Sequence, residues 1–454
     1  MKKKIIHRCT NCGYESIGKL GKCPQCNSWG TLLETVLEEK KSMNSKRPSL
    51  RKELKRLTDI KSTNSNRVVI NMKEFNRVMG GGIVRDSITI LSAKPGSGKS
   101  TLLLQVANEF CLQGYKVLYA SGEESESQIK SRADRILQKI DENLWVISDN
   151  SMDNVLEYIE EIDPDLIIVD SIQTFSLGEF PSSRPGSPTQ TMECAHKLVG
   201  VAKDHRRPRM VFVVGQMTKE DELAGLRALE HLVDTVLLIE GESGDELRTL
   251  LTTKNRYGST GEMGFFNMTE KGLTSLDNPS EYFMSTHRGR DLTGSSITVV
   301  REGTRPIVLE VESLISQSFT PYPSRISECM RRDQLNTLIS ILEQRGGINL
   351  FDKNVVIKTT GGMKLKEQAS NLAVIMSIVS SYYDVSIPSD MAFIADVGLT
   401  GELKKVPSIE ARIREIDRMG FTKAIIAESK NLKTKNIELL ELRNLRQVIQ
   451  MVKS

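Results

Sequence analysis

The sequence predicts an α/β protein whose largest domain contains a parallel β-sheet. Short apolar runs rich in β-branched residues alternate with helical segments from about residue 58 to residue 285, and this alternation is typical of parallel sheets. One of these runs, residues 87–91, leads into a glycine-rich turn and then into a helical pattern that starts at residue 102. The order of strand, glycine-rich turn and helix is the second observation that favours this fold class.

The glycine-rich turn covers residues 93–101 and reads AKPGSGKST. In such a loop, backbone N–H groups and the positive end of the following helix converge on an anion. Lys99 is expected to reach the β- and γ-phosphates of a nucleoside triphosphate, and the Ser100 hydroxyl to bind Mg²⁺. The consensus loop begins with glycine, whereas this chain has Ala93. The candidate nucleotide-binding residues are Ala93, Lys94, Pro95, Gly96, Ser97, Gly98, Lys99, Ser100 and Thr101.

Length and composition set limits on the class of protein. The chain has 454 residues and a formal net charge of +4. This length predicts two or three domains, and the small positive charge permits nucleic-acid contact without requiring it. No signal-peptide pattern follows the basic residues 2–4, and no apolar run is long enough to span a membrane. We therefore expect a soluble, cytoplasmic protein.

Four of the seven cysteines lie within the first 26 residues as two Cys-x-x-Cys pairs. The pairs are Cys9 with Cys12 and Cys23 with Cys26, and four such thiolates can surround one Zn²⁺ ion tetrahedrally. A redox dithiol is the alternative, but it leaves the second pair unexplained. We predict a zinc ribbon over residues 1–30, whose closed metal site has a structural or recognition role.

Residues 31–57 are dense in lysine, glutamate, arginine and serine, with little apolar periodicity. This composition predicts a flexible linker between the ribbon and the sheet domain. The basic residues between 46 and 56 are interpreted as a solvated charge run, with nucleic-acid contact as the alternative.

Two adjacent glutamates, Glu123 and Glu124, follow the predicted strand at residues 116–120. They are expected at the carboxyl edge of the sheet, where parallel sheets bind their ligands. A carboxylate at that edge can polarise a water molecule toward the γ-phosphate. An acidic pair favoured by a helix dipole is the alternative, and one glutamate can serve in each role.

Two further predicted strands end in polar residues at the same edge. The strand at residues 166–170 ends in Asp170, which is placed to bind Mg²⁺ and its waters, with a helix cap as the alternative interpretation. The strand at residues 210–215 is followed by Gln216. An amide at that position can contact the γ-phosphate and couple its presence to the segment that follows.

The predicted strands at residues 235–240 and 247–253 complete the sheet. The second strand continues into Lys254 and Arg256, which point the same way because side chains alternate along a strand. These cations suit phosphate groups, including those of a nucleotide held by a neighbouring subunit. A solvated basic turn is the alternative interpretation.

Several motifs, in this order, resemble the bacterial RadA (Sms) family of recombination and repair ATPases over nearly the whole chain. Beyond the four cysteines and the phosphate loop, they are GGGIV (80–84), SGEES (121–125), DSIQT (170–174), LEHLVDT (229–235), KNRYG (254–258) and GTRP (303–306). The resemblance implies a RecA-like core at residues 58–285 that assembles as a hexameric ring. It also implies an ATP-driven motor that promotes branch migration, much as helicases move on single-stranded DNA.

The resemblance further implies roles for individual residues. Glu123 matches the water-activating glutamate, and Gln216 occupies the sensor position, where many family members have histidine. Lys254 and Arg256 match the KNRFG signature and would act across a subunit interface, with Arg256 as the arginine finger. Tyr257 replaces the usual phenylalanine of that signature. Phosphate and metal contacts fall on Lys99, Ser100, Thr101 and Asp170.

In the leading hypothesis, DNA passes through the centre of the ring. The candidate DNA contacts are the segments at residues 175–191 and 217–227, through Arg184, Lys219 and Arg227. The expected cofactors are ATP, Mg²⁺ and Zn²⁺. The expected partners are single-stranded and branched DNA, further copies of the chain, a RecA-type recombinase and, as an additional candidate, a replicative helicase.

Residues 286–454 resemble the proteolytic domain of Lon. That domain uses a serine nucleophile and a lysine base, and the aligned positions here hold Ala369 and Arg412. Arginine stays protonated and cannot serve as the base, so no peptidase activity is expected and the domain is assigned to holding the ring together. Two other hypotheses stay open, namely a regulatory ATPase that remodels protein partners and a DNA-binding scaffold switched by ATP.

Overall fold

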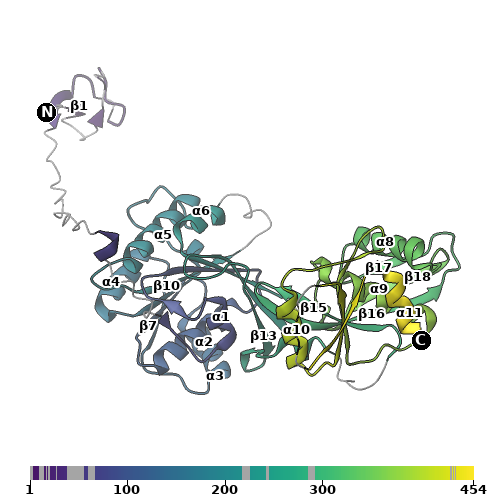
Figure 1. The fold of residues 1–454 in the computed structure, drawn as a ribbon. Coiled ribbons are helices and arrows are strands. Elements are labelled where there is room, and N and C mark those ends of the chain that lie inside the picture. Colours follow the sequence, from purple (N-terminus) through teal and green to yellow (C-terminus); the bar gives the residue numbers. More distant parts are fainter. Residues whose placement is uncertain are drawn as a thin grey trace. The chain divides into compact units, whose positions relative to one another are not determined.

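The computed structural model (Figure 1) describes residues 4–9, 15–16, 18, 21–26, 28–37, 56–59, 67–216, 225–241, 245–284, 292–429, 432, 434 and 436–453. The chain divides into two compact units, Met1–Thr63 and Asn64–Ser454. None of the helices in these described ranges is long and apolar enough to cross a membrane.

The smaller unit contains a three-stranded antiparallel sheet in the order β2-β1-β3. Its elements are β1 (Lys4–Cys9), β2 (Glu15–Ser16), β3 (Leu32–Leu37) and a short 3-10 helix, η1 (Leu57–Asp59). The strand β3 pairs with all of β1, from Lys4 opposite Leu37 to Cys9 opposite Leu32. The boundary predicted at residue 30 therefore falls too early, because the start of the predicted linker is a strand of the ribbon.

The larger unit contains a nine-stranded sheet in the order β14-β13-β12-β11-β6-β10-β9-β7-β8. Its strands are β6 (Ile88–Ala93), β7 (Val117–Ser121), β8 (Leu144–Ser148), β9 (Leu166–Asp170), β10 (Met210–Gln216), β11 (Thr235–Glu240), β12 (Leu247–Asn255), β13 (Met263–Thr269) and β14 (Gly272–Ser275). From β11 to β8 in this order, each adjacent pair of strands is parallel. This arrangement confirms the predicted α/β class.

The prediction that the strand ending near residue 253 completes the sheet is wrong. The strand β8 lies at one edge of the sheet, and β13 and β14 extend the other edge as antiparallel strands. Residues of β8 are only partly buried or exposed, so its sequence carries a weak apolar signal. The strand β12 also runs antiparallel to β11, as expected for strands joined by a short connection.

Helices cover both faces of this sheet (Figure 1). They are α1 (Lys73–Val78), α2 (Lys99–Leu112), α3 (Glu126–Ile136), α4 (Met152–Ile162), α5 (Pro188–Ala202) and α6 (Gly225–Leu232), and a short helix, α7 (Pro279–Tyr282), follows β14. One buried cluster joins the sheet to α1, α2 and α3, and a second joins it to α4, α5 and α6. A small antiparallel pair, β4 (Arg67–Val68) and β5 (Ile83–Val84), precedes β6.

A second sheet of seven strands, in the order β17-β18-β16-β15-β19-β22-β23, forms the carboxyl-terminal part of the larger unit. Its strands are β15 (Ser295–Glu302), β16 (Arg305–Gln317), β17 (Arg325–Ser327), β18 (Lys353–Thr359), β19 (Met391–Ile394), β22 (Lys423–Ala427) and β23 (Glu438–Leu442). A small hairpin adds β20 (Asp396–Val397) and β21 (Leu403–Lys404). The helices are α8 (Arg332–Ile341), α9 (Asn371–Tyr383), α10 (Ile409–Arg418) and α11 (Leu445–Lys453).

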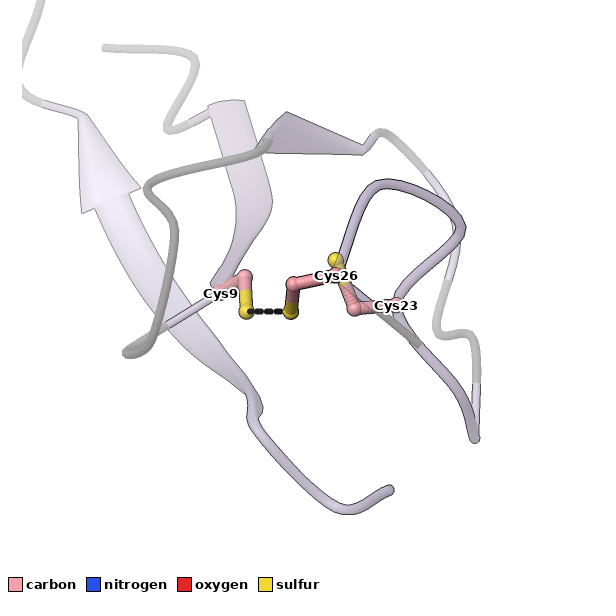
Figure 2. Close-up of side chains that lie close together, drawn as sticks. All are labelled: Cys9, Cys23 and Cys26. Carbon is pink, nitrogen blue, oxygen red and sulfur yellow. Dashed lines mark hydrogen bonds between the residues drawn. The ribbon is translucent and has the colours of Figure 1, made fainter. Parts of the chain in front are cut away.

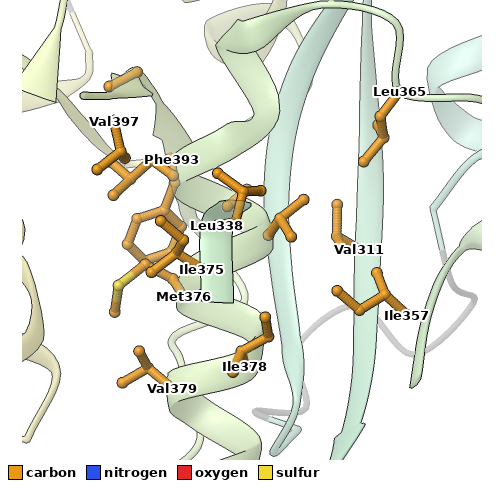
Figure 3. Packing of buried hydrophobic residues seen from close by; sticks show 14 of the residues in the cluster. Val311, Leu338, Ile357, Leu365, Ile375, Met376, Ile378, Val379, Phe393 and Val397 are labelled. Carbon is orange, nitrogen blue, oxygen red and sulfur yellow. The ribbon is translucent and has the colours of Figure 1, made fainter. Parts of the chain in front are cut away.

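The helix α9 forms the centre of this second core. Residues 372–380 are all buried, so the helix is enclosed rather than amphipathic. Figure 3 shows Ile375 and Ile378 of α9 in the same buried cluster as Val311 of β16 and Ile357 of β18.

The turn between β15 and β16 contacts the first sheet domain. Arg305 Nη1 lies 2.7 Å from Glu74 Oε1 of α1, and the other Glu74 oxygen accepts from the backbone N–H of Phe265 at 3.0 Å. A Cβ atom on Gly303 would lie 2.3 Å from the Gly261 carbonyl oxygen, so this close approach requires glycine. An ion pair and a tight backbone contact therefore hold the two sheet domains together.

Replacing Arg305 with alanine is expected to destabilise the larger unit by about 3 kcal/mol. The Glu74 side chain is only 5% exposed, and the substitution leaves its carboxylate without a cation. The midpoint of denaturant unfolding measures the effect. Lys73→Ala is the matched control, because its ion pair with Asp277 is solvent-exposed and contributes little. Equal midpoints for the two variants would contradict the proposed contribution of Arg305.

Candidate functional site

The phosphate loop lies between the buried strand β6 and the first turn of α2. Gly96 and Gly98 have φ angles of 78° and 101°, which glycine adopts without strain. A Cβ on Gly98 would lie 2.5 Å from Met268 Cε of β13. Ala93 is the buried last residue of β6, and its φ angle is not positive. Alanine is therefore accommodated where the consensus has glycine.

Lys99 is the first residue of α2, and its side chain folds back over the phosphate loop. Its Nζ donates to the carbonyl oxygens of Ala93 at 3.2 Å and Lys94 at 3.3 Å. Burial lowers the pKa of the Lys99 ammonium, and the negative charges of Asp170 and Glu123 oppose this effect. The carboxylates of Asp170 and Glu123 therefore help to balance the charge of the Lys99 ammonium, the group that is expected to bind phosphate.

Asp170 ends β9 directly beside the first turn of α2. Its Oδ2 accepts from the Ser100 hydroxyl at 2.7 Å and from the Tyr119 hydroxyl at 2.7 Å. Burial raises the pKa of the Asp170 carboxyl, while the two hydroxyl donors lower it. A hydroxyl oxygen beside a carboxylate oxygen is a set of hard ligands of the kind that Mg²⁺ prefers, so these residues fit the predicted metal. The peptide bond between Asp170 and Ser171 is cis.

Glu123 and Glu124 have different hydrogen-bond partners. Glu123 Oε1 accepts from the Ser171 hydroxyl and, at 2.7 Å, from Gln216 Nε2. Glu124 instead forms a bidentate ion pair with Arg132 of α3, with N–O distances of 2.6 and 2.5 Å. The hydrogen bond to Glu124 raises the pKa of Arg132. Glu123 thus binds groups at the ends of β9 and β10, whereas Glu124 is held by α3.

Lys254 and Arg256 lie at the amino-terminal ends of the parallel strands, whereas the phosphate loop lies at their carboxyl-terminal ends. Asn255 pairs with Thr235 at the start of β11, and Thr235 lies beside Thr89 near the start of β6. The loop follows the other end of β6. The structure therefore does not bring the two cations to the nucleotide site of the same chain.

The opposite edge contains a charge cluster around Asp234, whose side chain is only 1% exposed. Asp234 accepts from the backbone N–H of Ile88 at 3.0 Å, and Lys203 Nζ lies 2.7 Å from its Oδ2. Arg256 Nη1 lies 3.2 Å from its Oδ1. Lys203 also donates to the Tyr257 hydroxyl at 3.0 Å, a bond that phenylalanine at this position could not accept.

Sequence reasoning missed several of these partners, namely Tyr119, Arg132, Lys203 and the anchoring role of Asp234. Tyr119 lies inside a buried strand, and a lone tyrosine there is usually part of the core. The LEHLVDT motif contains Asp234 and was the one available signal for its importance.

The structure gives partial information on the candidate DNA contacts. Arg184 is exposed between η2 (Ile172–Thr174) and α5. Arg227 lies in α6, but its side chain is outside the described part of the chain, as is the whole of Lys219. The segment that precedes α5 is ordered, because the Gln190 side chain exchanges hydrogen bonds with the backbone of Leu177.

The predicted metal site brings together Cys9, Cys23 and Cys26 (Figure 2). Their sulfur atoms lie within 4.8 Å of one another, and the Cys9 and Cys26 sulfurs are 3.6 Å apart. Four thiolates at tetrahedral Zn–S distances place sulfurs about 3.8 Å apart, so the three residues fit zinc. The fourth predicted ligand, Cys12, is outside the described residues.

The native chain is expected to contain one zinc ion, and Cys23→Ser to lose it, because a structural site needs all of its thiolates. Metal content by mass spectrometry measures this. Cys111→Ser is the matched control, since Cys111 is buried in α2 and burial raises its pKa to about 12. Retention of stoichiometric zinc by Cys23→Ser would contradict the assignment.

Comparisons with known proteins match parts of the chain to two families. The chain matches the AAA domain family over residues 55–199 and the rubredoxin metal binding domain family over residues 7–34. In solved structures, it is similar to the RadB recombinase, with a TM-score of 0.37 and 20% identity over 46% of this chain and 98% of that one.

Relatives with curated names cover the chain much more fully. It is 41% identical to the DNA repair protein RadA of Bacillus subtilis (strain 168), over 99% of this chain and 98% of the relative. It is also 41% identical to the protein of that name from Listeria monocytogenes, over 93% and 91% of the two chains. The resemblance seen in the sequence motifs is confirmed, and the chain belongs to the RadA family of DNA repair proteins.

Proposed function

We propose that the chain is an ATP-hydrolysing, DNA-binding motor of recombinational repair, which promotes branch migration as a helicase-like ring on single-stranded DNA. The observation that carries the proposal is the position of Glu123 between Ser171 and Gln216, beside the Ser100–Asp170 pair. Three strand ends and the phosphate loop thereby supply the groups that hydrolysis of a nucleoside triphosphate needs.

In this proposal the backbone N–H groups of residues 96–101 and the Lys99 ammonium bind the phosphates of ATP. Ser100 and Asp170 would hold Mg²⁺, which neutralises phosphate charge when bound. Glu123 accepts a proton from the attacking water, because its carboxylate is held by donors and is not consumed in an ion pair. Gln216 precedes the segment that carries Lys219, and therefore links the site to a candidate DNA contact.

Arg256 and Lys254 are proposed to contact the nucleotide of a neighbouring copy in a hexameric ring. Their position at the far edge of the sheet supports this role, because they cannot reach the phosphate loop of their own chain. Arg256 is 55% exposed and is anchored by Asp234. The side chain is thus held at the surface while its guanidinium stays accessible to a second subunit.

Three positively charged residues are proposed to bind the phosphates of single-stranded and branched DNA. They are Arg184, Lys219 and Arg227, and such contacts depend on salt and carry no sequence information. Phe175 is fully buried, so it is not available for base stacking. A RecA-type recombinase and a replicative helicase are the proposed protein partners.

The carboxyl-terminal domain is proposed to hold the ring together without peptidase activity. Arg412 is fully buried, and its guanidinium forms a bidentate ion pair with Glu367 at 2.6 and 2.7 Å. The Ser370 hydroxyl is buried and donates to the Glu367 carbonyl oxygen at 3.0 Å. An arginine held in this way stays charged and offers no base for a nucleophile.

Binding of a labelled single-stranded oligonucleotide across a range of salt concentrations tests the DNA part of the proposal. The native chain is expected to bind more weakly as the salt concentration rises. The logarithm of the binding constant should fall against the logarithm of the salt concentration with a slope of about 0.7 for each phosphate contact. Arg184→Ala should lower both the affinity and the slope. Absence of salt-dependent binding by the native chain would contradict the proposal and favour a regulatory ATPase that acts on protein partners.

A further inference from the structure

Arg248 of β12 is a buried cation beside the phosphate loop, and none of the roles above involves it. The residue is 5% exposed. Its Nε donates to the Ser97 carbonyl oxygen at 3.2 Å, and its Nη1 donates to the carbonyl oxygens of Asp245 at 2.6 Å and Leu247 at 2.9 Å. In the described parts of the chain, its hydrogen-bond partners are all uncharged carbonyl groups.

A buried guanidinium is costly unless its charge is balanced, and three carbonyl oxygens balance it only in part. The loop that Arg248 contacts is the one that would bind phosphates, so a bound nucleotide brings the missing negative charge close to it. The Ser97 hydroxyl is buried without a hydrogen-bond partner in the described structure. Among the described side chains, only that of Arg248 forms a hydrogen bond with Ser97, through the Ser97 carbonyl oxygen.

The position of Arg248 depends on Gly241, at the end of β11. A Cβ atom on Gly241 would lie 2.5 Å from Arg248 Cδ and 3.0 Å from Nε and Nη1. The atoms in conflict belong to the far part of a long side chain, so a substitution at Gly241 would displace the guanidinium, and the φ angle of 155° at Gly241 adds backbone strain for any other residue. Gly241 and Leu247 also line a cavity of about 640 Å³ that Met363 of the carboxyl-terminal domain lines as well.

We propose that Arg248 is a positioning residue, which sets the backbone of the phosphate loop at Ser97 for nucleotide binding and couples it to the connection between β11 and β12. The inference rests on the nucleotide site proposed above. It assigns Arg248 a role in affinity, with no contact to the reacting atoms. Changes at Gly241 or Asp245, which line the cavity shared with the carboxyl-terminal domain, thereby alter nucleotide affinity from a distance.

Titration of a fluorescent ATP analogue into the full chain tests this role. Arg248→Gln and Gly241→Ala are both expected to raise the Kd about tenfold or more, the range for loss of a hydrogen bond to a charged group. Arg248→Lys should restore part of the affinity, because it keeps the charge. Arg77→Gln is the matched control: it removes an arginine that pairs with Glu262 without contacting the loop, and its Kd should stay near native.

A native Kd in either Arg248→Gln or Gly241→Ala would overturn the proposal. A second pattern would also overturn it: the thermal midpoints of the nucleotide-free variants fall in proportion to their loss of affinity, and Arg248→Lys restores neither. That pattern marks a merely structural role. Failure of the native chain to bind the analogue would instead overturn the nucleotide site itself. The two failures are therefore distinguishable.

Discussion

Replacing Glu123 with glutamine is expected to lower the steady-state rate of ATP hydrolysis about 100- to 10,000-fold, the usual contribution of a general base. Glutamine keeps the size of the side chain and an oxygen that can accept from Gln216, which now donates to Glu123 at 2.7 Å. Its amide cannot take a proton from water. ATP binding should stay near native, because Lys99 and the phosphate loop are unchanged. A coupled assay of phosphate release measures the turnover.

Glu124→Gln is the matched control for this prediction, because it makes the same chemical change one residue away. Glu124 is bound by Arg132 and has no role in the proposed chemistry, so turnover is expected to stay within a few fold of native. Equal losses in the two variants would show that the acidic pair acts only structurally. Native turnover in Glu123→Gln would remove Glu123 from the proposed mechanism.

Arg256→Ala is expected to lower ATP turnover about 1,000-fold or more, as removal of an arginine finger does. The guanidinium would stabilise charge on the γ-phosphate of a neighbouring subunit, and alanine supplies no replacement. Arg206 is the matched control, since it is exposed in the turn before β10, at the same edge of the sheet. Arg206→Ala should keep native turnover.

Mixtures of two inactive variants distinguish action in the neighbouring subunit from action in the same chain. Assemblies of Arg256→Ala with Lys99→Ala contain some interfaces that combine a native Lys99 with a native Arg256. Partial recovery of turnover in the mixture is therefore expected, although each variant alone is inactive. If no proportion of the two variants recovers activity, Arg256 does not act across an interface.

The sequence predicted the parts of the site that depend on local pattern. The phosphate loop, Asp170 and Gln216 each follow an apolar strand, and parallel strands bring their carboxyl ends to one edge. The position of Lys254 and Arg256 away from their own phosphate loop is consistent with the predicted action between subunits, and this action is still to be tested. Local pattern was sufficient because these residues are placed by the strands that precede them.

Features that depend on tertiary contacts were not predictable in the same way. Local pattern left Glu123 and Glu124 equivalent and only the family resemblance favoured Glu123, whereas the contact of Glu124 with Arg132 depends on tertiary structure. The strand β3 reads LLETVL and is mostly apolar, but it is short and leads into a charged stretch, so only its pairing with β1 identifies it as part of the ribbon. Arg248 has no motif around it, and its contact with Ser97 arises from the antiparallel edge of the sheet, which the sequence did not predict in full.

The central claim is that ATP hydrolysis by this chain is coupled to DNA. Steady-state hydrolysis by the native protein, with and without single-stranded DNA at fixed salt, tests it most directly. The proposal predicts that DNA stimulates turnover and that Lys99→Ala abolishes both the basal and the stimulated rates. Hydrolysis that requires Lys99 but does not respond to DNA would contradict the motor and favour an ATPase that remodels protein partners.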